Sequence, residues 1–455
     1  MGVILMSFSI IFKHVTEIIP LFLSFLILTI SVFLTFKTRF VQFRTIPKMF
    51  PLLFQSIFKK KTIIGDADTI PAYKALFTAM STAVGVGNMF APAIAIKLGG
   101  PGALLGFLLV TLFGSALTFT EVTYAVKYRE EHPDGSITGG VLIYIKKALS
   151  NFYAKLFAYA GLVTVIIYSG AQANTIADLL QARGIPTHFT GIIIAITITY
   201  ILIGGIQRIG DFSAKIVPLM FIVYFAGSFW IIFKNLNQLP KVINMIFRTA
   251  FTPQAILGAG AGYGFLSAMR WGLAKGFYTN ESGTGIATFP HSMAQTKKPT
   301  SQGILAIIST FSNGIMCTIS GLIVLLTQTW QDPELGVGIN IIAKSFSIYF
   351  PTIGIAIFLF SALLFAIGTI LGNSYNGSQC LLYISNKKYL KCYYVTTAFI
   401  IFFSSILDVE LLARFTDLLL LPIALPNLLA LLITTFKDGD ALKINTSSAF
   451  HFKKN

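Results

Sequence analysis

The chain has 455 residues, of which 55% are hydrophobic and only 11% are charged, and its formal net charge is +17. Soluble domains carry about 25% charged residues, so this composition excludes an ordinary water-soluble protein. The mean hydropathy of +0.76 indicates an all-α membrane protein with the lipid bilayer as its solvent. Because the basic residues lie in short loops between apolar segments, the positive-inside rule explains the charge, and we expect no nucleic-acid partner.

Segments of about 20 mostly apolar residues predict the transmembrane helices. Eleven candidates occur, and counts of ten or twelve are the alternatives if 255–280 or 350–374 is divided differently. The candidates are 18–36, 74–97, 102–125, 153–174, 189–205, 213–233, 255–280, 302–327, 350–374, 392–408 and 411–435. Residues 1–12 and 139–149 predict short interfacial helices.

The Lys and Arg residues predict the orientation of these segments. The loop 37–71 is rich in both, so we expect it in the cytoplasm, and with eleven spans the tail 438–455 is cytoplasmic too. The N-terminus is then outside, and the expected location is the inner membrane of the cell. We expect the basic, moderately apolar loop to lie on the membrane face; contact with an accessory protein is the alternative.

Two of the apolar segments are interrupted by glycines. The second contains Gly85-Val86-Gly87-Asn88, and the seventh contains four glycines between 258 and 264 before the polar run 279–285. Glycines in corresponding segments of two halves point to a transporter site built from broken helices.

The span count divides the chain into two sets of five. The first five-helix repeat is expected at 72–234, and a second, inverted repeat at 235–437. The segment 1–36 supplies an extra N-terminal helix. The inversion follows from the odd number of spans in each set.

An opened helix at Gly85 and Gly87 would expose backbone groups that cannot stay unpaired in lipid. The N–H groups at a new helix N-terminus suit a carboxylate. The carbonyl oxygens suit an ammonium group or a hard cation such as Na⁺. An amino-acid zwitterion with a cation would satisfy both, whereas close packing of helices through small residues is the alternative explanation.

Three polar side chains within spans are candidates for the same site. Gln172 lies in the fourth span, where an amide is costly unless it faces the bundle interior. Thr369 and Asn373, in the ninth span, lie on one helix face. Alternatively, Gln172 only ties two helices together, and the Thr369 hydroxyl bonds back to its own helix.

The acids and histidines give no indication of an enzyme. We expect Glu121 to form an interfacial salt bridge with Lys127 or Arg129, and Glu281 to pair with nearby basic residues. His291 has no second histidine nearby. Without a convergent set of reactive side chains, we predict no catalytic residue, no metal cofactor and no enzymatic activity.

Several stretches resemble the alanine/glycine:cation symporter family, also called sodium:alanine symporters. The most specific are Leu98-Gly99-Gly100-Pro101-Gly102-Ala103 and Asn280-Glu281-Ser282-Gly283-Thr284-Gly285. The other matching stretches are 79–88, 125–129, 172–177, 275–279, 298–299, 302–303 and 369–372, with His291 in register.

This resemblance implies an eleven-span, leucine-transporter-like fold of two inverted five-helix repeats. It implies uptake of a small neutral amino acid, alanine or glycine, coupled to Na⁺ or sometimes to H⁺. The implied substrate site contains Gly85, Gly87, Asn88, Phe90, Gln172, Phe277, Thr369 and Asn373. The implied Na⁺ site contains Thr82, Gly85 and Thr369.

The chain departs from the family pattern at functional positions. Val86 replaces a threonine, Gly368 replaces the first of two threonines, and Asn373 replaces a tryptophan, while Phe90 and Pro92 stand where small residues are usual. We therefore expect a weaker sodium site and a larger, more polar pocket. The alternatives are a proton-coupled or uncoupled carrier of another small amino acid and, further away, a channel or a transport-inactive receptor.

Overall fold

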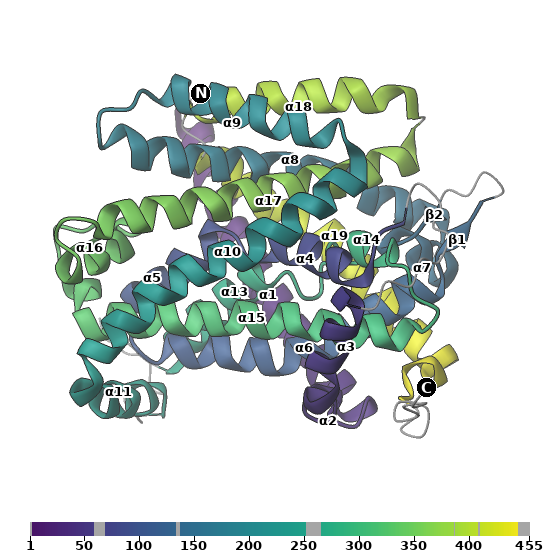
Figure 1. Ribbon diagram of the computed structural model, residues 1–455, viewed down its shortest axis with the longest axis horizontal. Coiled ribbons are helices and arrows are strands. Elements are labelled where there is room, and N and C mark those ends of the chain that lie inside the picture. Colours follow the sequence, from purple (N-terminus) through teal and green to yellow (C-terminus); the bar gives the residue numbers. More distant parts are fainter. Residues whose placement is uncertain are drawn as a thin grey trace.

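The computed structural model describes residues 2–58, 69–132, 137–251, 265–385, 387–407 and 410–444. Long helices run along the longest axis of the molecule and pack side by side (Figure 1). The helices are α1 (Gly2–Lys37), α2 (Val41–Arg44), α3 (Ile46–Phe58), α4 (Ala72–Ala83), α5 (Val86–Gly99), α6 (Ala103–Lys127), α7 (Val141–Ala148), α8 (Asn151–Gln181), α9 (Thr187–Leu202), α10 (Gly205–Lys234), α11 (Leu239–Phe251), α13 (Phe265–Asn280), α14 (Thr288–Ser292), α15 (Pro299–Thr327), α16 (Asn340–Tyr349), α17 (Gly354–Ile384), α18 (Leu390–Ser404) and α19 (Glu410–Asp438).

Ten of the eleven predicted spans coincide with described helices, and of the seventh, 255–280, residues 265–280 are helical. By length and composition, seven of these helices could cross a membrane, and the α4–α5 pair makes an eighth if it counts as one span. α9, α13 and α18 hold the other three predicted spans and are shorter, with 16, 16 and 15 residues. The predicted glycine cluster before α13 lies outside the described residues. The all-helical membrane fold is confirmed.

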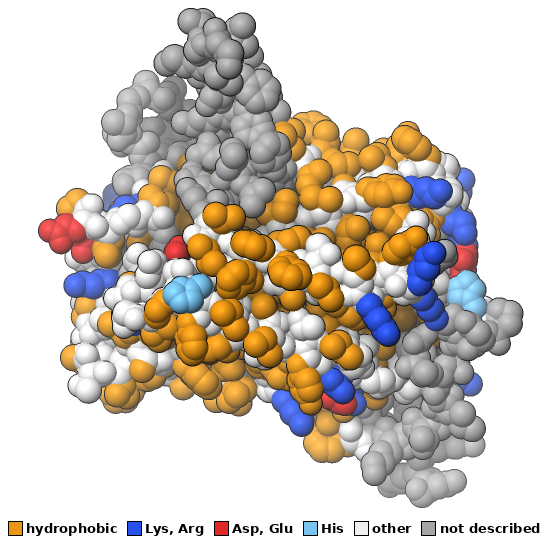
Figure 2. All heavy atoms as spheres, turned by 90° about the horizontal axis from the view of Figure 1, so that it is seen from above, with side chains coloured by type: hydrophobic (Ala, Val, Ile, Leu, Met, Phe, Trp, Pro, Cys, Tyr) orange, Lys and Arg blue, Asp and Glu red, His pale blue; other side chains and the backbone are white. Residues whose placement is uncertain are grey.

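The helices expose apolar side chains to their surroundings, as lipid contact requires. Hydrophobic side chains cover the middle of the face in Figure 2, while most charged side chains lie toward the ends of the long axis. Phe229 and Phe399 are among the phenylalanines that the described helices expose. The arrangement is that of a bundle whose long axis crosses the bilayer.

The interfacial segments differ in part from their predictions. α7 coincides with the predicted helix at 139–149. The predicted short helix at 1–12 is instead part of α1, which continues through Pro20 to Lys37. In the loop 37–71, α3 exposes Phe50, Phe54 and Phe58, spaced one turn apart, as a helix lying on a membrane surface would. A two-stranded hairpin, β1 (Glu130–Glu131) with β2 (Ile137–Thr138), adds a small non-helical element.

Two broken helices cross at the centre of the bundle. α4 and α5 form one apolar segment bent by 42°. α13 ends at Asn280, and α14 begins at Thr288 after a non-helical segment. α5 packs against α13, whereas α4 packs against α14. The two interrupted segments therefore run in opposite directions with their breaks side by side, which is the arrangement expected of inverted repeats.

Candidate functional site

The first break has the geometry of a new helix start. α4 ends at Ala83, and Gly85 has an extended backbone with φ −109° and ψ −172°. The Gly85 N–H donates to Asn88 Oδ1 at 3.0 Å, and the Asn88 N–H donates to the Gly85 oxygen at 3.1 Å. Asn88 therefore caps α5 from within, in the manner of a capping box. This accounts for its buried side chain before any contact with substrate is considered.

α17 packs directly on this break. A Cβ atom added to Gly85 would lie 2.5 Å from Thr369 Oγ1, and one added to Gly372 would overlap the Thr82 side chain. The end of α4 and Gly85 thus pack on the face of α17 that carries Thr369 and Gly372. The Thr369 hydroxyl also donates to the Phe365 oxygen at 3.0 Å, so the back-bonded geometry predicted as the alternative is present as well.

Gly87 faces open space beside this contact. Among the described residues, a Cβ atom at Gly87 would have no atom within 4 Å outside its own helical turn, although the segment around it is buried. Gly87 lies in the first turn of α5, where backbone N–H groups have no partner within the helix. The helix dipole favours a negative group at the same position. The break thus leaves room for a carboxylate beside unpaired donors.

Gln172 and Asn373 lie near the same level of the bundle. α8 and α17 run antiparallel, since the Cβ position of Gly161 lies 3.2 Å from Cys380 Sγ and that of Gly377 lies 2.9 Å from Val165. Continuing this register places Gln172 opposite Thr369. Gln172 Oε1 and Asn373 Oδ1 are buried without a hydrogen-bond partner among the described residues. Such atoms need a partner, and a polar ligand would supply one.

Asn313 of α15 connects the two breaks. Its Nδ2 donates to the Ala83 oxygen at 2.8 Å and to the Thr279 oxygen at 2.6 Å, the carbonyls at the ends of α4 and α13. Both side-chain polar atoms of Asn280 are buried and have no partner in the described structure. The sequence analysis did not single out Asn313 or Asn280, although an amide within a membrane span indicates a polar contact inside the bundle.

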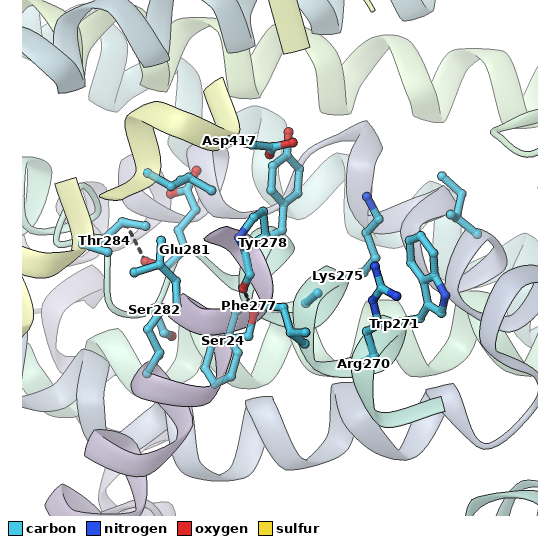
Figure 3. A pocket seen from close by; sticks show the side chains of 18 of the residues that line it. Ser24, Arg270, Trp271, Lys275, Phe277, Tyr278, Glu281, Ser282, Thr284 and Asp417 are labelled. Atoms are coloured by element: carbon cyan, nitrogen blue, oxygen red, sulfur yellow. Dashed lines mark hydrogen bonds between the residues drawn. The ribbon is translucent and has the colours of Figure 1, made fainter. Parts of the chain in front are cut away.

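A cavity of about 780 Å³ lies between α1, α5, α8, α13 and α19. Of the eight predicted substrate residues, Phe90 and Phe277 line this cavity, whereas the other six do not. Figure 3 shows Glu281 and Thr284 of the second break at one end of the cavity. Its walls are mainly apolar and belong to α5, to α13 and to residues 20–27 of α1.

The cavity also contains charged groups that the sequence reading did not bring together. Lys275 lies over the Tyr278 ring, 5.7 Å from its centroid, and Asp417 of α19 lines the same space (Figure 3). The Tyr278 ring stands edge-on to Tyr168 at 5.5 Å. These residues come from segments distant in sequence, so no local pattern could have predicted the group.

The opposite side of the breaks is tied together by polar contacts. Ile70, before α4, pairs with Ala294, after α14. Arg129 donates to the Ser292 oxygen at 3.2 Å and to the Ala294 oxygen at 2.7 Å. These contacts hold the starting end of α4 against the finishing end of α14. The central site therefore meets a cavity on one side and a bonded layer on the other.

His291 of α14 belongs to this bonded layer. It is fully buried, and its Nδ1 lies 2.7 Å from Gln302 Nε2. Burial lowers the pKa of the His291 imidazole to about 3, because a charged ring would lose its hydration. His291 is therefore a neutral structural residue.

The predicted salt bridge of Glu121 is wrong. Lys127 pairs with Asp438, and Arg129 pairs with Glu131. Glu121 is instead buried and accepts hydrogen bonds from Gly283 and Asn427. The short sequence distance to Lys127 was misleading because six residues turn a helix by more than one and a half turns, onto another face.

The chemistry available for a cation is that of neutral oxygen atoms. Among the described residues, no group of three or more His, Cys, Asp and Glu side chains could hold a metal ion. The first break instead offers the Thr369 hydroxyl and the carbonyls that the end of α4 leaves unpaired. Hard cations prefer oxygen ligands of this kind.

Sequence comparisons identify the family. The profile of the sodium:alanine symporter family matches residues 6–443. The chain is 35% identical over 408 residues to an uncharacterized transporter of Haemophilus influenzae, covering 88% of both chains. It is 31% identical over 418 residues to the sodium/alanine symporter AgcS of Methanococcus maripaludis, covering 90% of both. The probable sodium/glutamine symporter GlnT of Bacillus subtilis is 28% identical over 425 residues, which is 92% of this chain and 86% of GlnT.

The fold is similar to a solved transporter structure. The crystal structure of MhsT in complex with L-phenylalanine superposes with a TM-score of 0.56 at 16% sequence identity, covering 81% of this chain and 90% of MhsT. This similarity confirms the leucine-transporter-like fold. The chain therefore belongs to the sodium:alanine symporter family, whose members are multi-pass membrane proteins that couple amino-acid transport to a cation and are not enzymes.

Proposed function

We propose that this protein carries a small neutral amino acid into the cell together with Na⁺. The observation that carries the proposal is the contact of Gly85 with Thr369 beside the open space at Gly87. The space beside Gly87 receives the substrate carboxylate at the N-terminus of α5. Oxygens of Thr82, Gly85 and Thr369 surround the cation.

The remaining predicted residues complete the substrate site. Gln172 Oε1 and Asn373 Oδ1 are the unpaired acceptors that suit an ammonium group. Phe90 and Phe277 line the cavity from which the substrate reaches the site. Asn88 fixes the start of α5. With asparagine at 373, the site accepts a substrate with a polar side chain more readily than it would with tryptophan at that position.

The substrate class has two candidates. The relative AgcS is named for alanine, whereas GlnT is named for glutamine at similar identity. Alanine or glycine follows from the family pattern that most of the site retains. Asn373 favours glutamine as the second candidate, because two amides pair with each other through complementary donors and acceptors.

The proposed orientation and repeat organisation fit the same mechanism. The repeats 72–234 and 235–437 each contribute one broken helix. If the basic segment 37–58 is cytoplasmic, the cavity faces outside and the bonded layer faces inside. Substrate then enters from outside, along the cavity.

Uptake into proteoliposomes tests the proposal. Labelled alanine, glycine and glutamine are supplied with an inward Na⁺ gradient and, separately, with a proton gradient alone. Concentrative uptake of one of them that requires Na⁺ supports the proposal. Uptake driven by a proton gradient alone would show that H⁺ and not Na⁺ is the coupling ion. The absence of uptake of all three amino acids by folded protein would overturn the proposed substrate class.

A further inference from the structure

Glu121 is a buried carboxyl group at the centre of α6. It is 1% exposed, and its Oε1 accepts from the Gly283 N–H at 3.1 Å and from Asn427 Nδ2 at 2.7 Å. The backbone of Gly285 also donates to this carboxyl group. No Lys or Arg of the described chain forms a salt bridge with it. Its partners are thus N–H donors, and two of the three belong to the second break.

The backbone of the second break is shaped to hold an anion. Glu281, Gly283 and Gly285 have φ values of 55°, 89° and 73°. Left-handed residues at every second position turn successive N–H groups toward one side, which forms an anion-binding nest. The Glu121 carboxyl group lies where the nest donates.

Asn427 of α19 supports the same arrangement from the other side. Its Nδ2 group donates to Glu121 Oε1 and also to the Gly283 oxygen, at 2.9 Å. The Tyr144 hydroxyl of α7 donates to Asn427 Oδ1. The peptide groups at Gly283 are therefore held by an acceptor from α6 and a donor from α19.

The two helix breaks differ in the side chain that bonds to their free backbone groups. At the first, Asn88 of the same segment caps the helix, and Gly87 faces open space. At the second, a side chain from another helix fills the nest. We propose that Glu121 is a positioning residue for transport: its carboxyl group accepts hydrogen bonds that hold residues 281–287 in the non-helical form facing the cavity.

The contacts of Glu121 affect the residues of the segment 281–287 that line the cavity. Glu281, Ser282 and Thr284 line the cavity, whereas Gly283 and Gly285 face Glu121. A Cβ atom at Gly283 would meet Ile27 at 3.0 Å, and one at Gly285 would overlap Val141, so the segment is closely packed at both glycines. Weakening the Glu121 contacts should free the segment and change the exposure of Thr284.

Thiol labelling measures this exposure without any transport assay. Cys317 and Cys380 are buried and Cys392 is exposed, so Cys392→Ser gives a background of low reactivity. Thr284→Cys then reports on the second break, and Ile94→Cys reports on the α5 wall of the same cavity. Both are labelled in purified protein with a small methanethiosulfonate reagent, with and without Glu121→Gln.

The proposal predicts a local effect. Glu121→Gln keeps one acceptor oxygen but replaces the other by an amide N–H₂ group, so at least one of the N–H donors around it loses its acceptor. Labelling of Thr284→Cys should rise about tenfold, the size expected when one buried donor is left without a partner. Labelling of Ile94→Cys should not change. The exposed Glu334 provides the matched control, since Glu334→Gln should change neither rate.

Two results would overturn the proposal. One is an unchanged Thr284→Cys rate in folded Glu121→Gln protein, and the other is an equal rise at both reporters, which means general loosening. If Glu121→Gln does not fold, Asn427→Leu provides the test, because it leaves the Glu121 carboxyl group in place and removes the α19 amide that holds both this group and the Gly283 oxygen. The absence of a rise in Thr284→Cys labelling there contradicts the proposal. Since labelling does not need uptake, this outcome is independent of the proposed substrate and ion.

Discussion

The Thr369 hydroxyl lies against Gly85 at the point where α4 gives way to α5. A Cβ atom at Gly85 would stand 2.5 Å from Thr369 Oγ1, closer than two such atoms approach. The φ of Gly85 is −109°, which any residue adopts, so glycine is required here by the close approach of α17 and not by the backbone. The contact joins a backbone turn to a hydroxyl oxygen, as a sodium site needs.

The two glycines of the first break should respond differently to alanine. Gly85→Ala pushes α17 away from the break, so we expect a loss of about 1–3 kcal/mol in stability together with weaker Na⁺ dependence. Gly87→Ala has no close contact with the described residues outside its own helical turn and should fold normally, but its methyl group fills the proposed carboxylate space and raises the KM for the amino acid. Thermal unfolding and uptake kinetics of both variants check this pair. Normal substrate KM in folded Gly87→Ala would contradict the placement of the carboxylate.

Gly368 should be a position where sodium affinity can be increased. A Cβ atom there would lie 3.6 Å from Ser81 Cβ and 3.8 Å from the Ser81 oxygen, which are ordinary contacts. Gly368→Ser therefore adds a hydroxyl next to the first break without a clash. We expect half-maximal uptake at a several-fold lower Na⁺ concentration. Gly368→Ala has the same Cβ without the oxygen, and an equal effect of both substitutions would assign the change to packing.

Asn313 should matter for both stability and transport. Asn313→Ala leaves the Ala83 and Thr279 carbonyls without their amide donor, at a cost of about 1–2 kcal/mol. Because these carbonyls end α4 and α13, the KM for substrate or Na⁺ should rise as well. Asn174 is the matched control, since its Nδ2 also bridges two carbonyls, those of Ser404 and Leu407, away from the breaks. Asn174→Ala should lower the melting temperature with little change in KM.

The buried His291 should make folding less favourable in acid. In the unfolded chain the imidazole binds a proton below its ordinary pKa of 6.5, whereas in the folded protein it stays neutral down to about 3. The contribution of His291 to stability is therefore complete above pH 6.5 and falls as the pH drops toward 3. The melting temperature of detergent-solubilised protein measured against pH tests this, and His291→Gln should flatten the acid slope. An equally steep slope in that variant would assign the acid sensitivity to other groups.

The sequence was sufficient for the features that depend on local composition. Apolar length identified the spans, and Gly85 with Gly87 identified the first break, because glycine pairs in a span allow the helix to open. The spacing of Thr369 and Asn373 identified one face of α17. The resemblance supplied the assignment of that face to the first break, which the Gly85–Thr369 contact agrees with.

Contacts between distant segments were not accessible from the sequence. Glu121 was assigned to Lys127 because the two are close in sequence, yet its partners Gly283 and Asn427 are more than 160 residues away. Asn313 is one amide in an apolar helix, and only the packing of α15 against both broken helices gives it a role. Such contacts depend on the tertiary arrangement of the helices, and no periodic pattern of residues along the sequence predicts them.

The central claim is that the first break and Thr369 form the coupled site for Na⁺ and substrate. The most direct measurement is Na⁺-driven uptake of alanine, glycine and glutamine by proteoliposomes containing the parent protein or Thr369→Val, which keeps the shape of the side chain and removes its oxygen. The account predicts concentrative, Na⁺-dependent uptake of one of them by the parent protein and a large rise in the Na⁺ concentration required by the variant. Unchanged Na⁺ dependence in folded Thr369→Val would contradict it.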